Sequence, residues 1–161
     1  MELYHGSNMV VSAPRILEPT HTLDFGPGFY TTLNRDQAAA FAAKVVDRAR
    51  TGVATLNVYA FDETEAFRQC CVLRFDGPDG RWLDFVAAHR RGTPSSGSYD
   101  LVFGPVANDN VYRTLGLFMA GVLDRDQTLA ALKARPLFNQ MVFATPKALS
   151  FLRFVRKEDV R

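Results

Sequence analysis

Residues 24–32 read DFGPGFYTT, and this stretch predicts more about the fold than any other part of the chain. Gly26 and Gly28 are one residue apart, so the backbone can bend there, or approach a ligand, where a Cβ would clash. Phe29 and Tyr30 follow directly, as expected at the start of a short strand. Taken alone, the stretch is typical of a tight turn that enters a buried strand. A functional interpretation of this stretch depends on the segments on either side of it.

Short apolar runs alternate irregularly with helical segments, which predicts an α+β fold. No phosphate-binding GxGxxG opens a helix, so a doubly wound sheet is disfavoured. Strands are expected at Glu2–Tyr4, Gly28–Thr31, Val53–Phe61, Cys71–Phe75, Leu101–Phe103, Gln140–Ala144 and Leu152–Val155. Helices are expected at Arg35–Arg50, Arg81–Arg90, Asn108–Ala120 and Arg125–Ala134.

The first helix has the clearest pattern. Asn34 is a suitable N-cap, and Thr51-Gly52 is a suitable end, with glycine in the C-cap role. Between them, small and apolar residues recur at helical spacing, namely Ala38, Phe41, Ala42, Val45 and Ala49.

Length and composition predict one globular domain. The chain has 161 residues, 47% of them hydrophobic and 22% charged, which suits a single core and argues against disorder. The longest apolar runs, such as Val53–Phe61, are too short to span a bilayer. The N-terminus has neither the basic start nor the apolar core of a secretory signal. We therefore expect a cytoplasmic protein formed by residues 1–161.

Cysteines and charge exclude some classes of site. Cys70 and Cys71 are adjacent, so they can bond each other only with strain, and two thiols make no four-ligand zinc site. No metal is expected. The net charge is only +2, from 19 basic and 17 acidic residues, which is too balanced to predict nucleic-acid binding. Most of the basic residues are arginines, which suit phosphate contacts, although a coding bias explains this equally well.

Two segments far from residues 24–32 complete a pattern. Tyr4-His5-Gly6-Ser7 comes before it, and Asn139-Gln140-Met141-Val142-Phe143 comes after it. In this order the three segments resemble the nucleotide pocket of the ADP-ribosyltransferases, in the His–Tyr–Glu branch that includes the poly(ADP-ribose) polymerases and diphtheria toxin. The chain also resembles an uncharacterised bacterial family of small toxin-like domains. The resemblance implies two short, mostly antiparallel sheets packed at an angle with flanking helices, and NAD in the cleft between them.

The resemblance assigns contacts with both ends of NAD to the first segment. It implies that His5 binds the 2′-hydroxyl of the adenosine-side ribose, since an imidazole can donate one hydrogen bond and accept another. It also implies that the backbone of Gly6 pairs with the nicotinamide carboxamide, and that Ser7 lies near the same ribose as His5. Without the resemblance, a lone histidine in an apolar strand would be a core or edge residue.

The nicotinamide side is assigned to the second segment and the helix after it. Tyr30 matches the aromatic residue that stacks on the cationic nicotinamide ring, and Gly28 would let the backbone approach the nucleotide. Phe41 stands where the family often has a second tyrosine. It is either the other wall of this ring site or a core residue of the helix, since it shares the apolar face with Ala38 and Val45.

Two departures from the family weaken the implied catalysis. Ala38 stands where relatives often have a serine that bonds the carboxamide. Gln140 stands where the catalytic glutamate is expected, so the implied catalytic set is His5, Tyr30 and Gln140. A glutamine can bond the ribose, but it neither stabilises an oxocarbenium-like cation nor acts as a base. Other polar residues, one of whose carboxylates could replace the glutamate, are Asp84, His89, Asp100, Asn108 and Asp109.

The sequence therefore favours an NAD-dependent mono-ADP-ribosyltransferase, with a protein or nucleic acid as acceptor. Its size fits a bacterial toxin or effector, such as the toxin of a toxin–antitoxin pair with a small antitoxin protein as partner. This last step is analogy. An NAD glycohydrolase and a non-catalytic NAD- or ADP-ribose-binding module remain as alternatives. RNA 2′-phosphotransferase chemistry would need further groups, for which His21 and His89 are the candidates.

Overall fold

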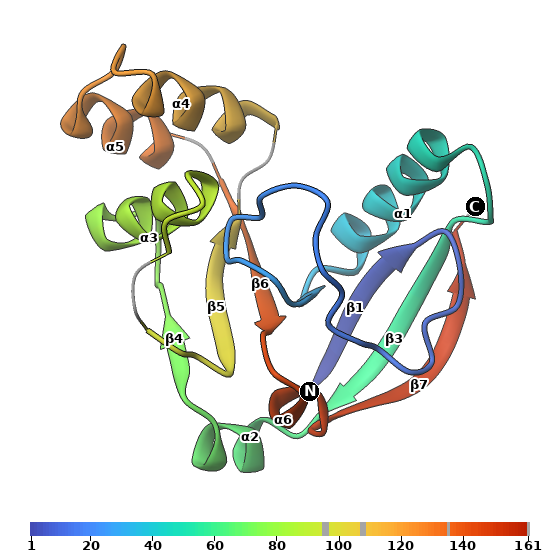
Figure 1. Cartoon of the computed structure of the whole chain (residues 1–161). Coiled ribbons are helices and arrows are strands. Elements are labelled where there is room, and N and C mark those ends of the chain that lie inside the picture. Colours follow the sequence, from blue (N-terminus) through green and yellow to red (C-terminus); the bar gives the residue numbers. More distant parts are fainter. Residues whose placement is uncertain (95–96, 107–108, 135, 161) are drawn as a thin grey trace.

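A computed structural model describes residues 1–94, 97–106, 109–134 and 136–160. Within these ranges the chain forms seven strands and six helices (Figure 1). The strands are β1 (Glu2–Ser7), β2 (Phe29–Thr32), β3 (Thr55–Phe61), β4 (Val72–Arg74), β5 (Leu101–Val106), β6 (Phe138–Phe143) and β7 (Leu152–Asp159). The helices are α1 (Arg35–Ala49), α2 (Glu63–Gln69), α3 (Gly80–Arg90), α4 (Asp109–Met119), α5 (Arg125–Lys133) and α6 (Pro146–Leu149).

The strands form one mixed sheet in the order β4-β5-β6-β2-β1-β3-β7. Only β4 and β5 pair in parallel; the other neighbours are antiparallel. The α+β class is confirmed, but the expectation of two separate sheets is wrong. A single registered pair, Tyr4 with Thr32, joins β1 to β2 and so connects the two halves, whereas β1 pairs with β3 over its whole length, from Glu2 to Ser7.

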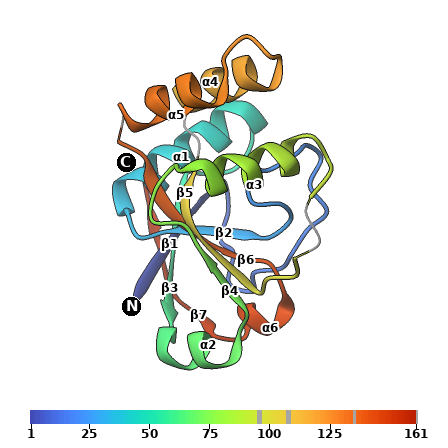
Figure 2. The ribbon, with the colours of Figure 1, turned by 90° about the vertical axis from the view of Figure 1, so that its left-hand side faces the viewer.

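Two hydrophobic cores lie on opposite faces of the sheet. Successive side chains of a strand point to opposite faces, and β6 shows this clearly: Val142 belongs to the first core, and its neighbours Met141 and Phe143 belong to the second. Helices α3, α4 and α5 cover the first core, while α2 and α6 contribute to the second. Figure 2 shows α1, α3, α4 and α5 gathered at one end of the molecule, with α2 and α6 at the other.

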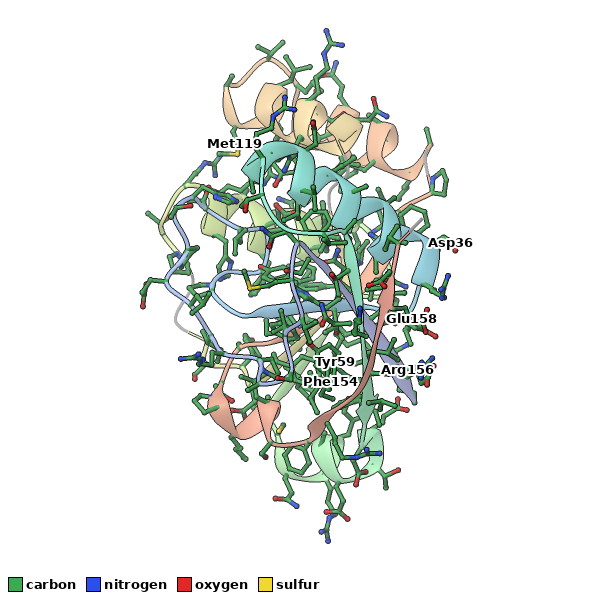
Figure 3. The ribbon with its side chains drawn as sticks, turned by 90° about the vertical axis from the view of Figure 1, so that its right-hand side faces the viewer. Asp36, Tyr59, Met119, Phe154, Arg156 and Glu158 are labelled. Atoms are coloured by element: carbon green, nitrogen blue, oxygen red, sulfur yellow. The ribbon has the colours of Figure 1, made fainter. Side chains whose placement is uncertain are left out.

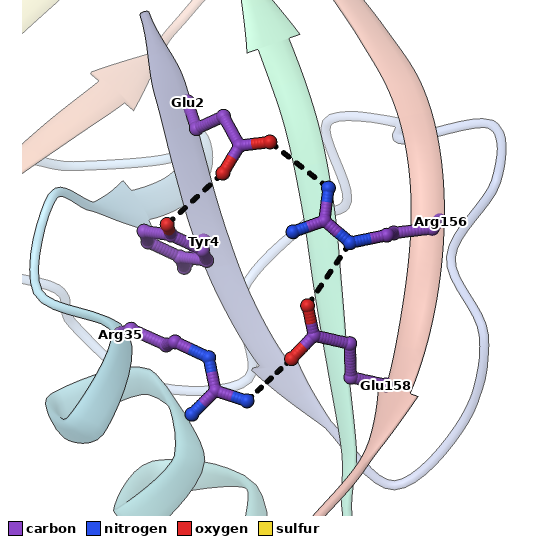
Figure 4. Close-up of polar contacts among 5 residues, drawn as sticks. All are labelled: Glu2, Tyr4, Arg35, Arg156 and Glu158. Carbon is purple, nitrogen blue, oxygen red and sulfur yellow. Dashed lines mark hydrogen bonds and ion pairs between the residues drawn. The ribbon is translucent and has the colours of Figure 1, made fainter.

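The outer edge of the sheet carries a chain of polar contacts. Arg156 of β7 binds Glu2 of β1 and Glu158 of its own strand, and Glu158 also pairs with Arg35 of α1 (Figure 4). Tyr4 donates to Glu2 at 3.1 Å. Nearby, Figure 3 shows Tyr59 and Phe154 side by side, in edge contact with ring centroids 5.8 Å apart. Ion pairs on the surface, such as those of Arg156, contribute little to the stability of the fold.

Asp100 joins three elements at the opposite end of the sheet, and this predicts acid sensitivity. It accepts from the Cys71 amide at 2.9 Å and the Thr145 hydroxyl at 2.7 Å, with Lys147 nearby. The Cys71 amide and the Thr145 hydroxyl hold the pKa of Asp100 below its usual value. A carboxylate with a depressed folded-state pKa stabilises the fold above its unfolded pKa of about 3.9, and this stability is lost as the pH falls further.

We expect Asp100→Asn to lower the unfolding free energy at pH 7 by about 2 kcal/mol, the scale of hydrogen bonds to a charged group. Between about pH 4 and about pH 2, as Asp100 becomes protonated in the folded state, the wild type should then lose stability more steeply than the variant. Thermal unfolding across this range, followed by circular dichroism, measures both slopes. Parallel slopes would mean that Asp100 contributes no pH-dependent stability.

Among the described residues, none of the helices combines the length and apolar character needed to cross a membrane.

Candidate functional site

The three sequence segments meet on neighbouring strands in the middle of the sheet. His5 lies in β1, Tyr30 in β2 and Gln140 in β6, and the sheet order places β2 between the other two. Thr32 links all three strands, because it pairs with Tyr4 on one side and with Gln140 on the other. Residues more than one hundred positions apart in the sequence therefore surround the point where the β1–β2 ladder stops.

His5 fills the space where β1 and β2 no longer pair. Its Nδ1 lies 2.8 Å from the carbonyl oxygen of Tyr30, and its ring stacks on Phe29 with centroids 4.4 Å apart. A carbonyl can only accept, so Nδ1 carries the proton and Nε2 is left as an acceptor. Burial lowers the pKa of His5 and keeps the ring neutral. A ligand group that meets Nε2 must donate a hydrogen bond, as a hydroxyl does.

Gly6 allows β1 to lie directly on helix α1. A Cβ at this position would be 2.0 Å from the carbonyl oxygen of Ala38 and 2.8 Å from the amide nitrogen of Ala42. Both alanines are buried. The strand–helix contact thus explains why residue 6 is a glycine, and it also explains the small residue at position 38, where relatives of the resembled family often have serine.

Tyr30 anchors the segment that precedes β2. Its hydroxyl donates to the Gly26 carbonyl at 2.7 Å and accepts from the Phe25 amide at 3.1 Å, while its ring packs against the first core. Burial raises the pKa of Tyr30 well above its usual value. Gly26 makes the bend with φ 78°. Gly28 packs against β6, since a Cβ there would be 2.6 Å from the Val142 side chain, so packing alone is enough to require a glycine.

Gln140 lies on the same face of the sheet as Tyr30. The register places it opposite Thr32, and Val142 opposite Tyr30, and alternate residues of a strand share a face. Its side chain is partly buried, and it forms no hydrogen bond with any other described residue. The hydroxyl of Thr32, its register partner, donates to the Gln37 side chain of α1 at 2.7 Å and not to Gln140. The Gln140 amide is therefore available to a ligand.

The comparisons with known proteins identify a family but no function. A family model described as "Protein of unknown function (DUF3990)" matches residues 1–154. The chain belongs to this family. The matched range includes His5, Tyr30 and Gln140. Neither the curated proteins nor the solved structures contain a match to the chain.

Phe41 lies on the exposed side of α1 in this member of the family. Its side chain is 49% exposed, whereas the next residue, Ala42, is fully buried. The interpretation of Phe41 as a core residue is therefore wrong. A half-exposed aromatic ring in the middle of a helix can still form one wall of a ligand site.

Asn57 is a polar residue of the site region that sequence reasoning missed. It is fully buried in β3, opposite His5 in the register. Its side chain accepts from the Val11 amide at 2.8 Å and donates to the Met9 carbonyl at 3.2 Å. Tyr59 adds a hydrogen bond from its hydroxyl to the Val11 carbonyl. These contacts fix residues 9–11 on the face of the sheet that carries His5. The sequence feature that could have identified Asn57 is its position as an asparagine within a run of apolar residues.

The aspartates considered as substitutes for the missing glutamate have other roles. Asp84 forms a bidentate ion pair with Arg125 of α5. Asp100 lies beside the other end of β6, about 13 Å along the strand from Gln140. The Asp84 carboxylate is thus engaged by Arg125, and Asp100 is too far along β6 to act at Gln140. Asn108 and the side chain of Asp109 lie outside the described part of the structure.

Two open hollows lie elsewhere on the surface. The larger, of about 480 Å³, is at the C-terminal end of α1. The second, of about 400 Å³, lies between residues 19–27 and the end of α3, and His21 and His89 both line it. The two histidines considered for phosphate chemistry are thus close together. Within the described residues, neither hollow is lined by His5 or Gln140.

Proposed function

We propose that the protein is an NAD-dependent mono-ADP-ribosyltransferase with NAD bound where β1 and β2 separate. The observation that carries the proposal is that His5, Tyr30 and Gln140 lie on three adjacent strands, with Tyr30 and Gln140 on one face of the sheet and His5 beside the point where β1 and β2 separate.

The sheet supports an ADP-ribosyltransferase-like fold. One half comprises β4-β5-β6-β2 and the other β1-β3-β7, and one residue pair joins them. A ligand lying across this junction would meet backbone groups of β1 that have no β2 partner beyond Tyr4. The position is suited to Gly6, whose amide and carbonyl would pair with the carboxamide of NAD.

Each side chain then has a role that matches its chemistry. The Nε2 atom of His5 would accept from a ribose hydroxyl, and Ser7 would lie near the same sugar. Tyr30 and the exposed ring of Phe41 would border the nicotinamide. The free amide of Gln140 would bond the nicotinamide-side ribose.

In the proposed reaction, the bond between nicotinamide and C1 of its ribose breaks, and nicotinamide leaves with the bonding electron pair. An acceptor nucleophile on a protein or nucleic acid then bonds to that carbon and loses its proton. Gln140 can orient the ribose but adds no negative charge to stabilise the cationic carbon. Transfer should therefore be slow and limited to one ADP-ribose unit. With water as the acceptor, the same site would be an NAD glycohydrolase.

The biological setting is part of the proposal. A compact transferase domain suits a bacterial toxin or effector that acts in the cytoplasm, with a small antitoxin protein as its partner. A non-catalytic NAD- or ADP-ribose-binding module is the second candidate, and it is favoured by the absence of a carboxylate at Gln140.

NAD binding should depend on His5. We expect calorimetric titration of the wild type to give heat with both NAD and ADP-ribose, and His5→Ala to weaken both ligands by about tenfold or more, because a hydrogen bond in a buried site is lost. His21→Ala, which removes an exposed histidine, is the matched control and should bind as the wild type does. If folded wild-type protein binds neither ligand, the proposed function is wrong.

A further inference from the structure

A buried ion pair holds Asp24, which lies six residues before Tyr30 in the chain. Arg90, at the end of α3, directs both Nε and Nη2 at one oxygen of Asp24, over distances of 2.8 and 2.6 Å. The two side chains are only 10% and 6% exposed. Removing both charges from water is unfavourable unless the geometry is well fixed. Such a pair is weak evidence of stability, and it is better explained by a need to hold Asp24 in one place.

A third element covers the arginine. The ring of Tyr112, in α4, lies over the guanidinium with 3.8 Å from Arg90 Cζ to the ring centroid. Contacts between a cation and an aromatic face are stronger where the cation is shielded from water. The Arg90 side chain is only 10% exposed, although Tyr112 itself is 45% exposed. The pair therefore connects α3, α4 and the segment that begins at Asp24.

The same segment holds the hydroxyl of Tyr30. Phe25 and Gly26, the two residues after Asp24, supply the amide and the carbonyl that bond it. Burial raises the pKa of Tyr30, and the nearby Asp24 and Tyr112 raise it further. Arg90, Asp24 and Tyr30 are thus joined through two residues of backbone. A shift of Arg90 would move the two groups that fix the Tyr30 ring.

We propose that Arg90, fixed by Asp24 and covered by Tyr112, is a positioning residue that sets the place of the Tyr30 ring at the nicotinamide end of the NAD site. This inference rests on the proposed function. It gives α4 a role in ligand binding, because the ring of Tyr112 keeps water from the ion pair. Arg90 itself need not contact the ligand.

The first test needs no ligand. Tyrosine labelled with ¹³C at Cζ gives one NMR signal for each of the five tyrosines, and Tyr30→Phe identifies the signal of Tyr30. We expect Arg90→Gln and Tyr112→Ala to shift or broaden this signal. The matched control is Asp84→Asn, which breaks the exposed ion pair of the same helix with Arg125 and should leave the signal unchanged.

The second test separates positioning from general destabilisation. Stacking on nicotinamide contributes about 1 kcal/mol, so its loss should weaken NAD by about fivefold. We expect Arg90→Gln to do this while changing the affinity for ADP-ribose, which lacks nicotinamide, much less. Arg90→Lys, which keeps the charge, and Tyr112→Ala provide the same comparison if Arg90→Gln does not fold.

The outcomes of the two tests distinguish a failure of the positioning role from a failure of the proposed function. An unmoved Tyr30 signal in the folded Arg90 and Tyr112 variants overturns the positioning role, whether or not NAD binds. Equal losses for NAD and ADP-ribose also overturn it, because they indicate a general loss of structure. If the wild type binds neither ligand but the Tyr30 signal moves as expected, the proposed function is wrong and Arg90 positions Tyr30 for another purpose.

Discussion

Replacing Gln140 with glutamate is expected to raise the rate of nicotinamide release from NAD about a hundredfold. A preorganised charge next to a developing cation is worth about 3 kcal/mol of transition-state stabilisation, and each 1.4 kcal/mol is about tenfold in rate. The position suits this change because the Gln140 side chain is partly buried and bonds no other described residue. The measurement is release of labelled nicotinamide by the wild type and the variant.

Two further variants make this result specific. Gln140→Ala should be slower than the wild type, since it also loses the hydrogen bond to the ribose. Asn139→Asp places a carboxylate one residue away on the opposite face of β6 and should leave the rate near that of the wild type. If Gln140→Glu is slower than the wild type, glutamine is the adapted group and another residue acts as the base. If NAD binds but neither the wild type nor any variant releases nicotinamide, with water or with added acceptors, the binding-module function is favoured.

Gly6→Ala is expected to lower the unfolding free energy by about 3 kcal/mol, the upper part of the range for overpacking a core. The new Cβ would lie 2.0 Å from the Ala38 carbonyl, so α1 would have to move away from β1. Both contacts are with backbone atoms, which cannot turn aside as a side chain can. Urea unfolding followed by Trp82 fluorescence gives the difference.

Gly116→Ala is the matched control for this change. Gly116 lies within α4, and a Cβ there would meet no other atom within 4 Å. Because alanine is a better helix former than glycine, this variant should be more stable by about 1 kcal/mol. A Gly6→Ala variant as stable as the wild type would contradict the close packing of β1 on α1.

Local sequence patterns predicted most of the elements. The helix expected at Arg35–Arg50 is α1, because Asn34 caps it through the Gln37 amide and its small residues face β1. It ends one residue earlier than expected, since Arg50 itself takes the left-handed conformation and Gly52 follows outside the helix. The strands containing Tyr30 and Gln140 were also predicted, because glycine, proline and apolar runs mark their limits.

What the sequence did not predict depends on contacts between distant residues. Helix α2 was missed because its seven residues have no long periodic pattern, although Asp62 caps it through the Glu65 amide. The ion pair of Asp24 with Arg90 joins positions 66 residues apart and has no local signature. The single sheet was missed for a similar reason, since only one residue pair connects its halves.

The candidate site was predictable in its membership but not in its geometry. His5, Tyr30 and Gln140 were chosen for their order in the chain, and that order carries no distances. The separation of β1 from β2 at Tyr4, and the insertion of His5 into the gap, follow from packing that no motif describes. The same applies to Gly6, whose lack of a side chain serves the contact with α1.

A crystal structure of the protein soaked with NAD tests the central claim most directly. The proposed function predicts density for the nucleotide where β1 and β2 separate, with a ribose hydroxyl at Nε2 of His5, the carboxamide on the backbone of Gly6 and the second ribose within reach of Gln140. Nicotinamide should lie beside Tyr30 and Phe41. Density in the hollow lined by His21 and His89, or no density at NAD concentrations that saturate the protein in solution, would contradict the claim.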